Sequence, residues 1–170
     1  IMNPFELPEK ILRYSEDHTS DEDRVLQGLY RMTHLKTVHP QMLSGKVQGQ
    51  FLSFISTRIR PKNILEVVTF TGYSAYCLQK GLQENGLLTT IEVNEELEDL
   101  ITGFFNDAGI NDRVRLIIGD ALDIIPDLKE SFNLIFIDAN KEHYPDYYKV
   151  CIDKLNTGGY IIADNVLWGG

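Results

Sequence analysis

The chain has little of what marks secreted or membrane-bound proteins. Only two of its 170 residues are cysteines, Cys77 and Cys151, and they lack the spacing of metal ligands. We therefore expect two buried free thiols and a cytoplasmic protein. No apolar run approaches the length of a membrane span, and no secretory signal opens the chain, so we expect no membrane association.

Positive charge is scarce as well. The chain has 16 Lys and Arg against 25 Asp and Glu, a formal net charge of −9. Because nucleic-acid binding needs clustered Lys and Arg, this balance argues against a large nucleic-acid surface but leaves room for a small basic patch. The length and the hydrophobic content of 43% predict a single domain over residues 1–170, with a helical part at 1–60 and an α/β core at 61–170.

Two phosphate-binding motifs are absent. The chain has no P-loop, and the turn that would carry G-x-G-x-x-G in a dinucleotide-binding protein holds only Gly72. Nucleoside triphosphate chemistry and a nicotinamide-dependent dehydrogenase are therefore poorly supported.

The stretch Ile64–Ser74 organises the rest of the chain. The apolar run Ile64–Val68 predicts a buried strand, and Thr71-Gly72 predicts a turn before a helix that begins at Ser74. The backbone N–H groups at such a helix start suit an anionic ligand group. In an open parallel sheet these turns line the ligand crevice.

On either side of this stretch the hydrophobic pattern differs. Residues 4–42 read as helical, with one helix at Pro8–Tyr14 and a capping signal at Ser20–Asp23 before the next. A third helix follows Gly45, with an apolar face formed by Val47, Phe51, Phe54, Ile55 and Ile59.

From residue 64 onward, strands alternate with helices. The expected strands are Ile64–Val68, Leu87–Val93, Val114–Ile118, Phe132–Ile137 and Tyr160–Ala163. The helices are expected after Gly72 to about Glu84, after Asn94, at Ala121–Leu128 and at Tyr144–Leu155. This alternation predicts an α/β fold, a Rossmann-like doubly wound parallel sheet with the N-terminal helices packed on it.

Polar residues follow four of these strands: Glu92, Asp120, Asp138 and Asp164-Asn165. Any one of them alone is as well explained as a helix cap. Because parallel strands end at the same edge of the sheet, the four together predict a ligand site there.

Glu92 can accept hydrogen bonds from both ribose hydroxyls of a nucleoside cofactor. S-adenosylmethionine is such a cofactor and needs no phosphate cradle, and its carboxylate suits the turn at Thr69–Ser74. The oxygen donors Asp138, Asp164 and Asn165 suit Mg²⁺ or Ca²⁺. Lys141 lies three residues after Asp138. An isolated lysine is most often solvated, but beside a cation its pKa would fall, which suits a general base.

These residues carry a family resemblance. Five stretches together resemble the cation-dependent O-methyltransferases, which include catechol and caffeoyl-CoA O-methyltransferases and their bacterial relatives: Leu65–Ser74, Glu92, Gly119–Ala121, Phe136–Lys141 and Ala163–Trp168. The likeness runs from about Met42 to the end of the chain. It implies the fold of the S-adenosylmethionine-dependent methyltransferases and an enzyme that methylates a hydroxyl group.

The resemblance also implies roles for individual residues. Asp138, Asp164 and Asn165 would bind the divalent cation, Mg²⁺ or Ca²⁺, and Lys141 and Asp138 would be catalytic. The S-adenosylmethionine site would be formed by Met42, Leu43, Glu66, Val68, Thr69, Gly72, Ser74, Glu92, Asp120, Ala121, Asp138 and Asn140. The expected acceptor is a catechol-like aromatic diol, and the alternative within the family is 5-hydroxyuridine in tRNA.

Two departures from the family pattern affect these expectations. Val68 stands where the family has glycine, so its side chain either crowds the methionine moiety or points into the core. The family also continues beyond the residue that ends this chain, Gly170, with an antiparallel strand pair that supports dimerisation. We therefore expect an unpaired sheet edge here and a homodimer in the full-length protein. A catalytically impaired binding homologue is the remaining alternative.

Overall fold

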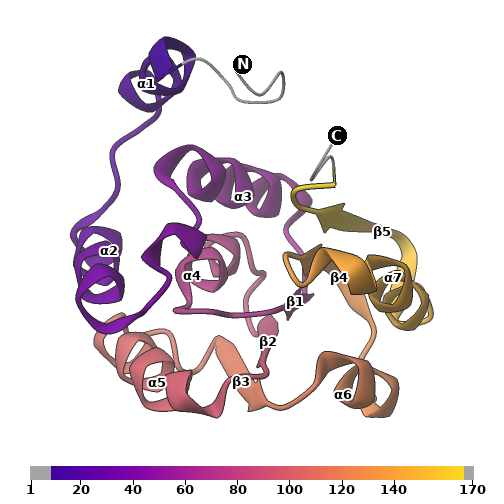
Figure 1. The fold of residues 1–170 in the computed structure, drawn as a ribbon. Coiled ribbons are helices and arrows are strands. Elements are labelled where there is room, and N and C mark those ends of the chain that lie inside the picture. The colour runs from indigo at the N-terminus through magenta and orange to yellow at the C-terminus, as the bar shows by residue number, and fades with distance from the viewer. Residues whose placement is uncertain (1–8, 167–170) are drawn as a thin grey trace.

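A five-stranded parallel sheet forms the centre of the molecule (Figure 1). The computed structural model describes residues 9–166, so Leu167 and Trp168 of the last family motif lie outside the described residues. The strand order is β3-β2-β1-β4-β5. The strands are β1 (Asn63–Val67), β2 (Leu87–Glu92), β3 (Val114–Ile118), β4 (Phe132–Ile137) and β5 (Leu155–Ala163).

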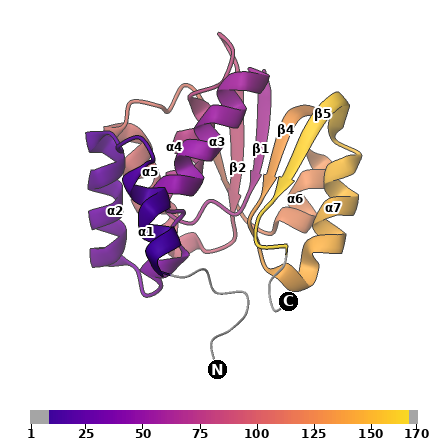
Figure 2. The same cartoon turned by 90° about the horizontal axis from the view of Figure 1, so that it is seen from above.

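Helices cover both faces of this sheet (Figure 2). One side carries α1 (Glu9–Asp17), α2 (Arg24–Lys36), α3 (Lys46–Ile59), α4 (Tyr73–Gln79) and α5 (Glu98–Asp107), and the other carries α6 (Ala121–Asp127) and α7 (Tyr144–Ile152). Short 3₁₀ turns lie at Pro40–Met42, Glu95–Leu97 and Lys141–His143. The predicted doubly wound α/β fold is confirmed.

Alternation along the strands explains the two layers. In β1, Ile64 packs into the core under α2–α5, whereas Leu65 and Val67 pack into the core under α6 and α7. Because successive strand residues point to opposite faces, a strand covered on both sides is mostly apolar, and the buried Glu66 is the exception in β1. Cys77 and Cys151 are buried free thiols, one in each core, as expected.

The N-terminal capping signal acts as predicted. The Asp23 carboxylate accepts the Leu26 N–H over 3.0 Å at the start of α2. The same carboxylate accepts the Tyr76 hydroxyl at 3.0 Å and pairs with Lys80 at 2.9 Å, so the cap also fastens α2 to α4.

The apolar face expected to bury α3 is the wrong one. Val47, Phe51 and Phe54 are exposed, Phe54 by 65%, and the buried positions are Gly49, Leu52 and Ser56. The reason is the close approach of α3 to α4, at which a Cβ on Gly49 would collide with the Tyr73 ring. Small residues therefore occupy the contact, and hydrophobic periodicity alone does not reveal it.

Three expected boundaries also shift. The strand β1 ends at Val67, because Val68 turns to a φ of +76° and leaves the sheet. The helix α4 ends at Gln79 rather than near Glu84. The strand β5 begins at Leu155 instead of Tyr160, since Leu155 pairs with Phe132 across an irregular stretch that contains Gly158 at φ +80°.

Candidate active site

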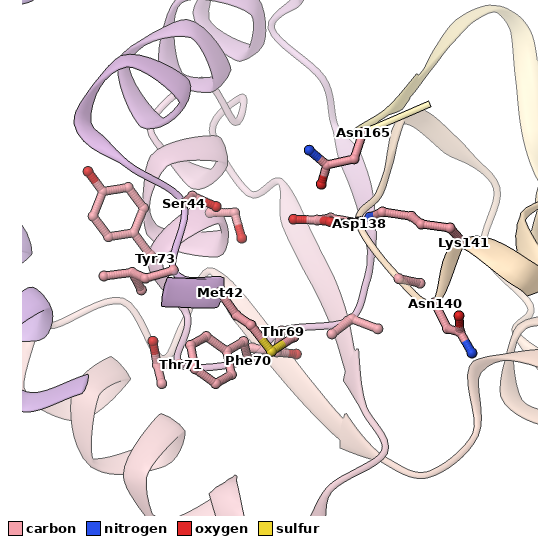
Figure 3. Close-up of a pocket in the computed structure, with 14 residues that line it drawn as sticks. Met42, Ser44, Thr69, Phe70, Thr71, Tyr73, Asp138, Asn140, Lys141 and Asn165 are labelled. Atoms are coloured by element: carbon pink, nitrogen blue, oxygen red, sulfur yellow. Dashed lines mark hydrogen bonds and ion pairs between the residues drawn. The ribbon is translucent and has the colours of Figure 1, made fainter. Parts of the chain in front are cut away.

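A cavity of about 430 Å³ opens at the carboxyl edge of the sheet, a volume typical of small-molecule sites (Figure 3). Asp138, Lys141 and Asn165 lie on one side of it, with Phe70 and Thr71 opposite. The remaining lining residues are Met42, Leu43, Ser44, Val68, Thr69, Tyr73, Ser74, Ala139 and Asn140. Segments 42–44, 68–74, 138–141 and 165 thus meet at one place. Of the polar residues that follow strands in the sequence, Asp138 and Asn165 line this cavity.

The turn after β1 is strained. Val68 and Phe70 have φ values of +76° and +51°, a region that β-branched and bulky residues rarely adopt. The turn is held by hydrogen bonds from Thr69 N–H to the Ile91 carbonyl at 3.0 Å and from Phe70 N–H to Glu92 Oε2 at 2.8 Å. Val68 therefore keeps a backbone conformation that favours glycine, and its side chain lines the cavity.

Glu66 is a fully buried carboxyl group beneath this turn. Its Oε2 accepts the Thr90 hydroxyl at 2.6 Å, and among the described residues its Oε1 has no hydrogen-bond partner. Burial raises the pKa of Glu66 to about 7, and the charges of Asp138 and Glu92 add to the effect. An unpartnered buried carboxyl oxygen is costly and suits a ligand that donates hydrogen bonds.

Glu92 is also buried, with 3% of its surface exposed. Its two carboxylate oxygens accept the N–H groups of Phe70 at 2.8 Å and of Asn94 at 2.9 Å. Each oxygen retains acceptor capacity beyond these bonds. Glu92 thus shapes the turn, a structural role that the sequence pattern did not indicate.

Lys141 and Asp138 form an ion pair at the rim of the cavity. The Lys141 ammonium lies 2.8 Å from Asp138 Oδ1 and donates to the Tyr144 hydroxyl at 2.9 Å. Burial lowers the pKa of Lys141, but the hydrogen bonds to Asp138 and Tyr144 outweigh it, so the pKa is raised overall. In this arrangement Lys141 is protonated at neutral pH.

Asp164 and Asn165 follow the neighbouring strand. The Asp164 N–H donates to the Ile137 carbonyl at 3.0 Å, which places Asp164 beside Asp138 at the sheet edge. The Asp164 carboxylate accepts the Gln48 side-chain amide at 2.8 Å and the Asn165 N–H at 2.8 Å. Asn165 itself has a φ of +53°, which asparagine tolerates well.

Several residues expected at the cofactor site lie outside the cavity lining: Glu66, Gly72, Glu92, Asp120 and Ala121. The expected cation ligand Asp164 also lies outside it. Asp120 caps α6 by accepting the Leu122 N–H at 2.8 Å, the alternative that the sequence left open. Gly72 has a φ of +93°, and a Cβ there would press on Phe105. The cofactor roles of these residues remain predictions.

The residues expected to hold a cation have suitable donor chemistry. Two carboxylates and an amide oxygen at adjoining strand ends are the ligands that Mg²⁺ and Ca²⁺ prefer. Within residues 9–166, however, no three His, Cys, Asp or Glu side chains gather as a metal-holding group. A cation at this site would therefore depend on Asn165 to complete the set.

Sequence reasoning missed Gln48 and Tyr144. Tyr144 donates its hydroxyl to the Asp164 carbonyl at 2.8 Å, and its position just after the Asp138–Lys141 motif is the signal that points to it. Gln48 reaches Asp164 across 116 positions of sequence, so no local pattern reveals that contact.

Comparison with known proteins agrees with this geometry. A family model described as O-methyltransferase matches residues 16–170. The chain belongs to the O-methyltransferase family. The predicted membership in this family of methyltransferase enzymes is thereby confirmed.

Individual relatives support the assignment. The chain is 30% identical to a caffeoyl-CoA O-methyltransferase of Stellaria longipes, covering 95% of this chain and 70% of the relative. It is 33% identical to caffeoyl-CoA O-methyltransferase 1 of Eucalyptus globulus, covering 89% of this chain and 65% of that relative. The chain thus spans about two thirds of the length of these curated relatives.

Solved structures of methyltransferases have the same fold. An SAH-bound methyltransferase from Podospora anserina matches with a TM-score of 0.89 and 28% identity over 98% of this chain and 74% of that one. An O-methyltransferase from Bacillus cereus in complex with SAH matches with a TM-score of 0.85 and 30% sequence identity. This match covers 94% of this chain and 74% of that one. In the part of the chain that the structure describes, no helix has the length and apolar character needed to cross a membrane.

Proposed function

We propose that this protein transfers the methyl group of S-adenosylmethionine to a hydroxyl of a catechol-like acceptor, with a divalent cation at the acceptor side. One observation carries the proposal: Asp138, Lys141 and Asn165 line the same cavity as the turn Val68–Ser74. Asp138 at the end of β4 and the strand-to-helix turn thus line the same cavity, and the SAH-bound structural relatives support the cofactor.

The turn would bind the methionine end of the cofactor. The unpartnered Oε1 of Glu66 suits the ammonium group, and the N–H groups at the start of α4 suit the carboxylate. Glu92, which already accepts two backbone N–H groups, would take the ribose hydroxyls with its remaining lone pairs. S-adenosylmethionine supplies an activated methyl group, and these residues fix its direction.

Asp138, Asp164 and Asn165 would hold the cation, and Lys141 would manage the proton of the acceptor hydroxyl. A bound divalent cation lowers the pKa of a hydroxyl that it contacts and fixes its orientation. Lys141 accepts a proton only when its ion pair with Asp138 is released, because that pair keeps the ammonium charged. Holding the hydroxyl in line with the methyl group supplies much of the acceleration.

Methyl transfer from labelled S-adenosylmethionine to catechol with Mg²⁺ tests the proposal. We expect labelled product, its loss with EDTA, and its loss in Asp138→Ala. Asp146→Ala is the matched control, because Asp146 pairs with Lys149 on the surface of α7 and should leave transfer unchanged. Transfer that persists with EDTA and in Asp138→Ala would contradict the metal mechanism.

Val68 favours a second candidate, a homologue that binds other molecules but has lost methyl transfer. Its side chain lines the cavity with a strained backbone and also packs against the core under α6 and α7. Calorimetry with S-adenosylmethionine separates the two candidates. Absent binding that Val68→Gly restores would support the impaired homologue, and binding by the unaltered protein would reject it.

A further inference from the structure

Every polar group of Asp164 is engaged. Its N–H donates to Ile137, its carbonyl accepts the Tyr144 hydroxyl, and its Oδ1 accepts the Asn165 N–H. Its Oδ2 accepts the Gln48 side-chain amide at 2.8 Å. An aspartate at a strand end that served only as a cap would not need four partners from β4, α7, its own turn and α3.

Gln48 is the partner that fixes the carboxylate. It lies in the first turn of α3, four positions after Ser44 in the cavity wall, and its side chain is partly buried. A side-chain amide that donates to a carboxylate restricts its rotation while leaving lone pairs free. The Gln48 side chain therefore sets the direction in which the Asp164 carboxylate oxygens point.

Tyr144 fixes the backbone at the same place. Its hydroxyl has one proton, which goes to the Asp164 carbonyl at 2.8 Å rather than to the Ile137 carbonyl at 3.3 Å. The hydroxyl oxygen then accepts from Lys141 at 2.9 Å. A single hydroxyl thus connects the Lys141–Asp138 pair to Asp164.

We infer that Gln48 and Tyr144 are positioning residues, which orient Asp164 and Lys141 for the cation and the acceptor. The inference rests on the proposed function, because it assigns Asp164 to the cation. Partners of this kind typically change metal affinity by about 10–100-fold when they are removed. Neither residue needs to touch the cation, the cofactor or the acceptor.

Gln48→Met tests the contact of Gln48 with Asp164, since methionine has a similar length but no amide donor. Mn²⁺ affinity is measured by electron paramagnetic resonance on the whole chain in the presence of SAH, and SAH affinity is measured by calorimetry. We expect Mn²⁺ binding to weaken about 10–100-fold while SAH binding stays unchanged. Gln50→Met is the matched control, because Gln50 is on the same helix and reaches only the Asp21 carbonyl, at 3.5 Å.

Tyr144→Phe tests the role of the Tyr144 hydroxyl, because it removes only the hydroxyl oxygen. We expect weaker Mn²⁺ binding while SAH binding stays unchanged, because the hydroxyl no longer holds the Asp164 carbonyl and Lys141 in place. Tyr148→Phe on the same helix is the control, since Tyr148 is 53% exposed. It should alter neither quantity.

The outcomes are distinguishable. Unchanged Mn²⁺ affinity in both variants, with binding intact in the unaltered protein, overturns the inference and leaves the proposed function standing. A parallel loss of Mn²⁺ and SAH binding also overturns it, because it reveals a general structural role. If the unaltered protein binds no Mn²⁺, the cation part of the proposed function is wrong and this inference falls with it.

Discussion

The Lys141 ammonium lies 2.8 Å from Asp138, and Lys149 lies 3.0 Å from Asp146 in a second pair with the same spacing. The two pairs differ in environment. The side chains of the first are 19% and 26% exposed and line the cavity, whereas those of the second are 73% and 51% exposed. Exposed pairs contribute little to stability, so the second pair is a natural control for the first.

Lys141→Met should lower methyl transfer by about 10²–10⁴-fold, the range for loss of a general acid–base group. The affinity for S-adenosylmethionine should change little, because the lysine is placed at the acceptor side. Initial rates with labelled cofactor and calorimetry measure the two quantities. Lys149→Met should match the unaltered protein in both, and a Lys141→Met enzyme with normal rates would exclude Lys141 as the base.

At Val68, a glycine variant should be more stable than an alanine variant, the reverse of the usual order. Both replacements lose the two valine methyl groups and glycine loses the Cβ as well, but only glycine adopts a φ of +76° without strain. We expect Val68→Gly to be more stable than Val68→Ala by about 1 kcal/mol, measured by urea unfolding. Equal stability of the two variants would show that the left-handed backbone is not retained in solution.

Glu66 should make stability depend on pH in the weakly acidic range. Because its pKa rises from 4.5 in the unfolded chain to about 7 in the folded one, the folded state binds more protons between these values. Stability should therefore fall as pH rises from about 4.5 to about 7, by at most about 3 kcal/mol at 1.36 kcal/mol per pKa unit. Glu66→Gln should flatten this part of the curve, and an unchanged slope would contradict the assignment.

The contact between α3 and the turn that follows α4 should tolerate no added methyl group. A Cβ on Gly81 would collide with the Ser56 backbone, so Gly81→Ala should cost about 1–3 kcal/mol. Gly103 in α5 has no neighbouring atom within 4 Å of an added Cβ, and Gly103→Ala should instead stabilise by about 0.5–1 kcal/mol. Thermal unfolding of the two variants compares the effects, and shifts in the same direction would refute the close approach.

The sequence predicted the sheet well because strand formation here depends on local pattern. The bounds of β3 and β4 match the apolar runs residue for residue. The burial of α3 was wrong because contacts through glycine and serine leave no hydrophobic signal. The early start of β5 was missed because Leu155 pairs with a strand about twenty residues earlier.

The site also has features that local sequence pattern predicted and features that it did not. Asp138 and Asn165 follow strands, and they were expected at one edge of the sheet because parallel strands end there. Lys141 was expected from its nearness to Asp138 and Asn140 from the family resemblance, and both line the cavity. The contacts of Gln48 with Asp164 and of Phe70 with Glu92 were not predicted, since both depend on side-chain or turn geometry across distant segments. Local patterns thus indicated where the chemistry lies, and long-range hydrogen bonds decide how it is oriented.

The strand order has a consequence for synthesis on the ribosome. The central strand β1 pairs with β4, with Ile64 opposite Leu134. This partner strand therefore emerges about 70 residues later. At roughly 5–20 residues per second, one edge of β1 waits several seconds for that partner. During this interval an apolar strand is open to other nascent chains, so slow translation between β1 and β4 should lower the yield of soluble protein.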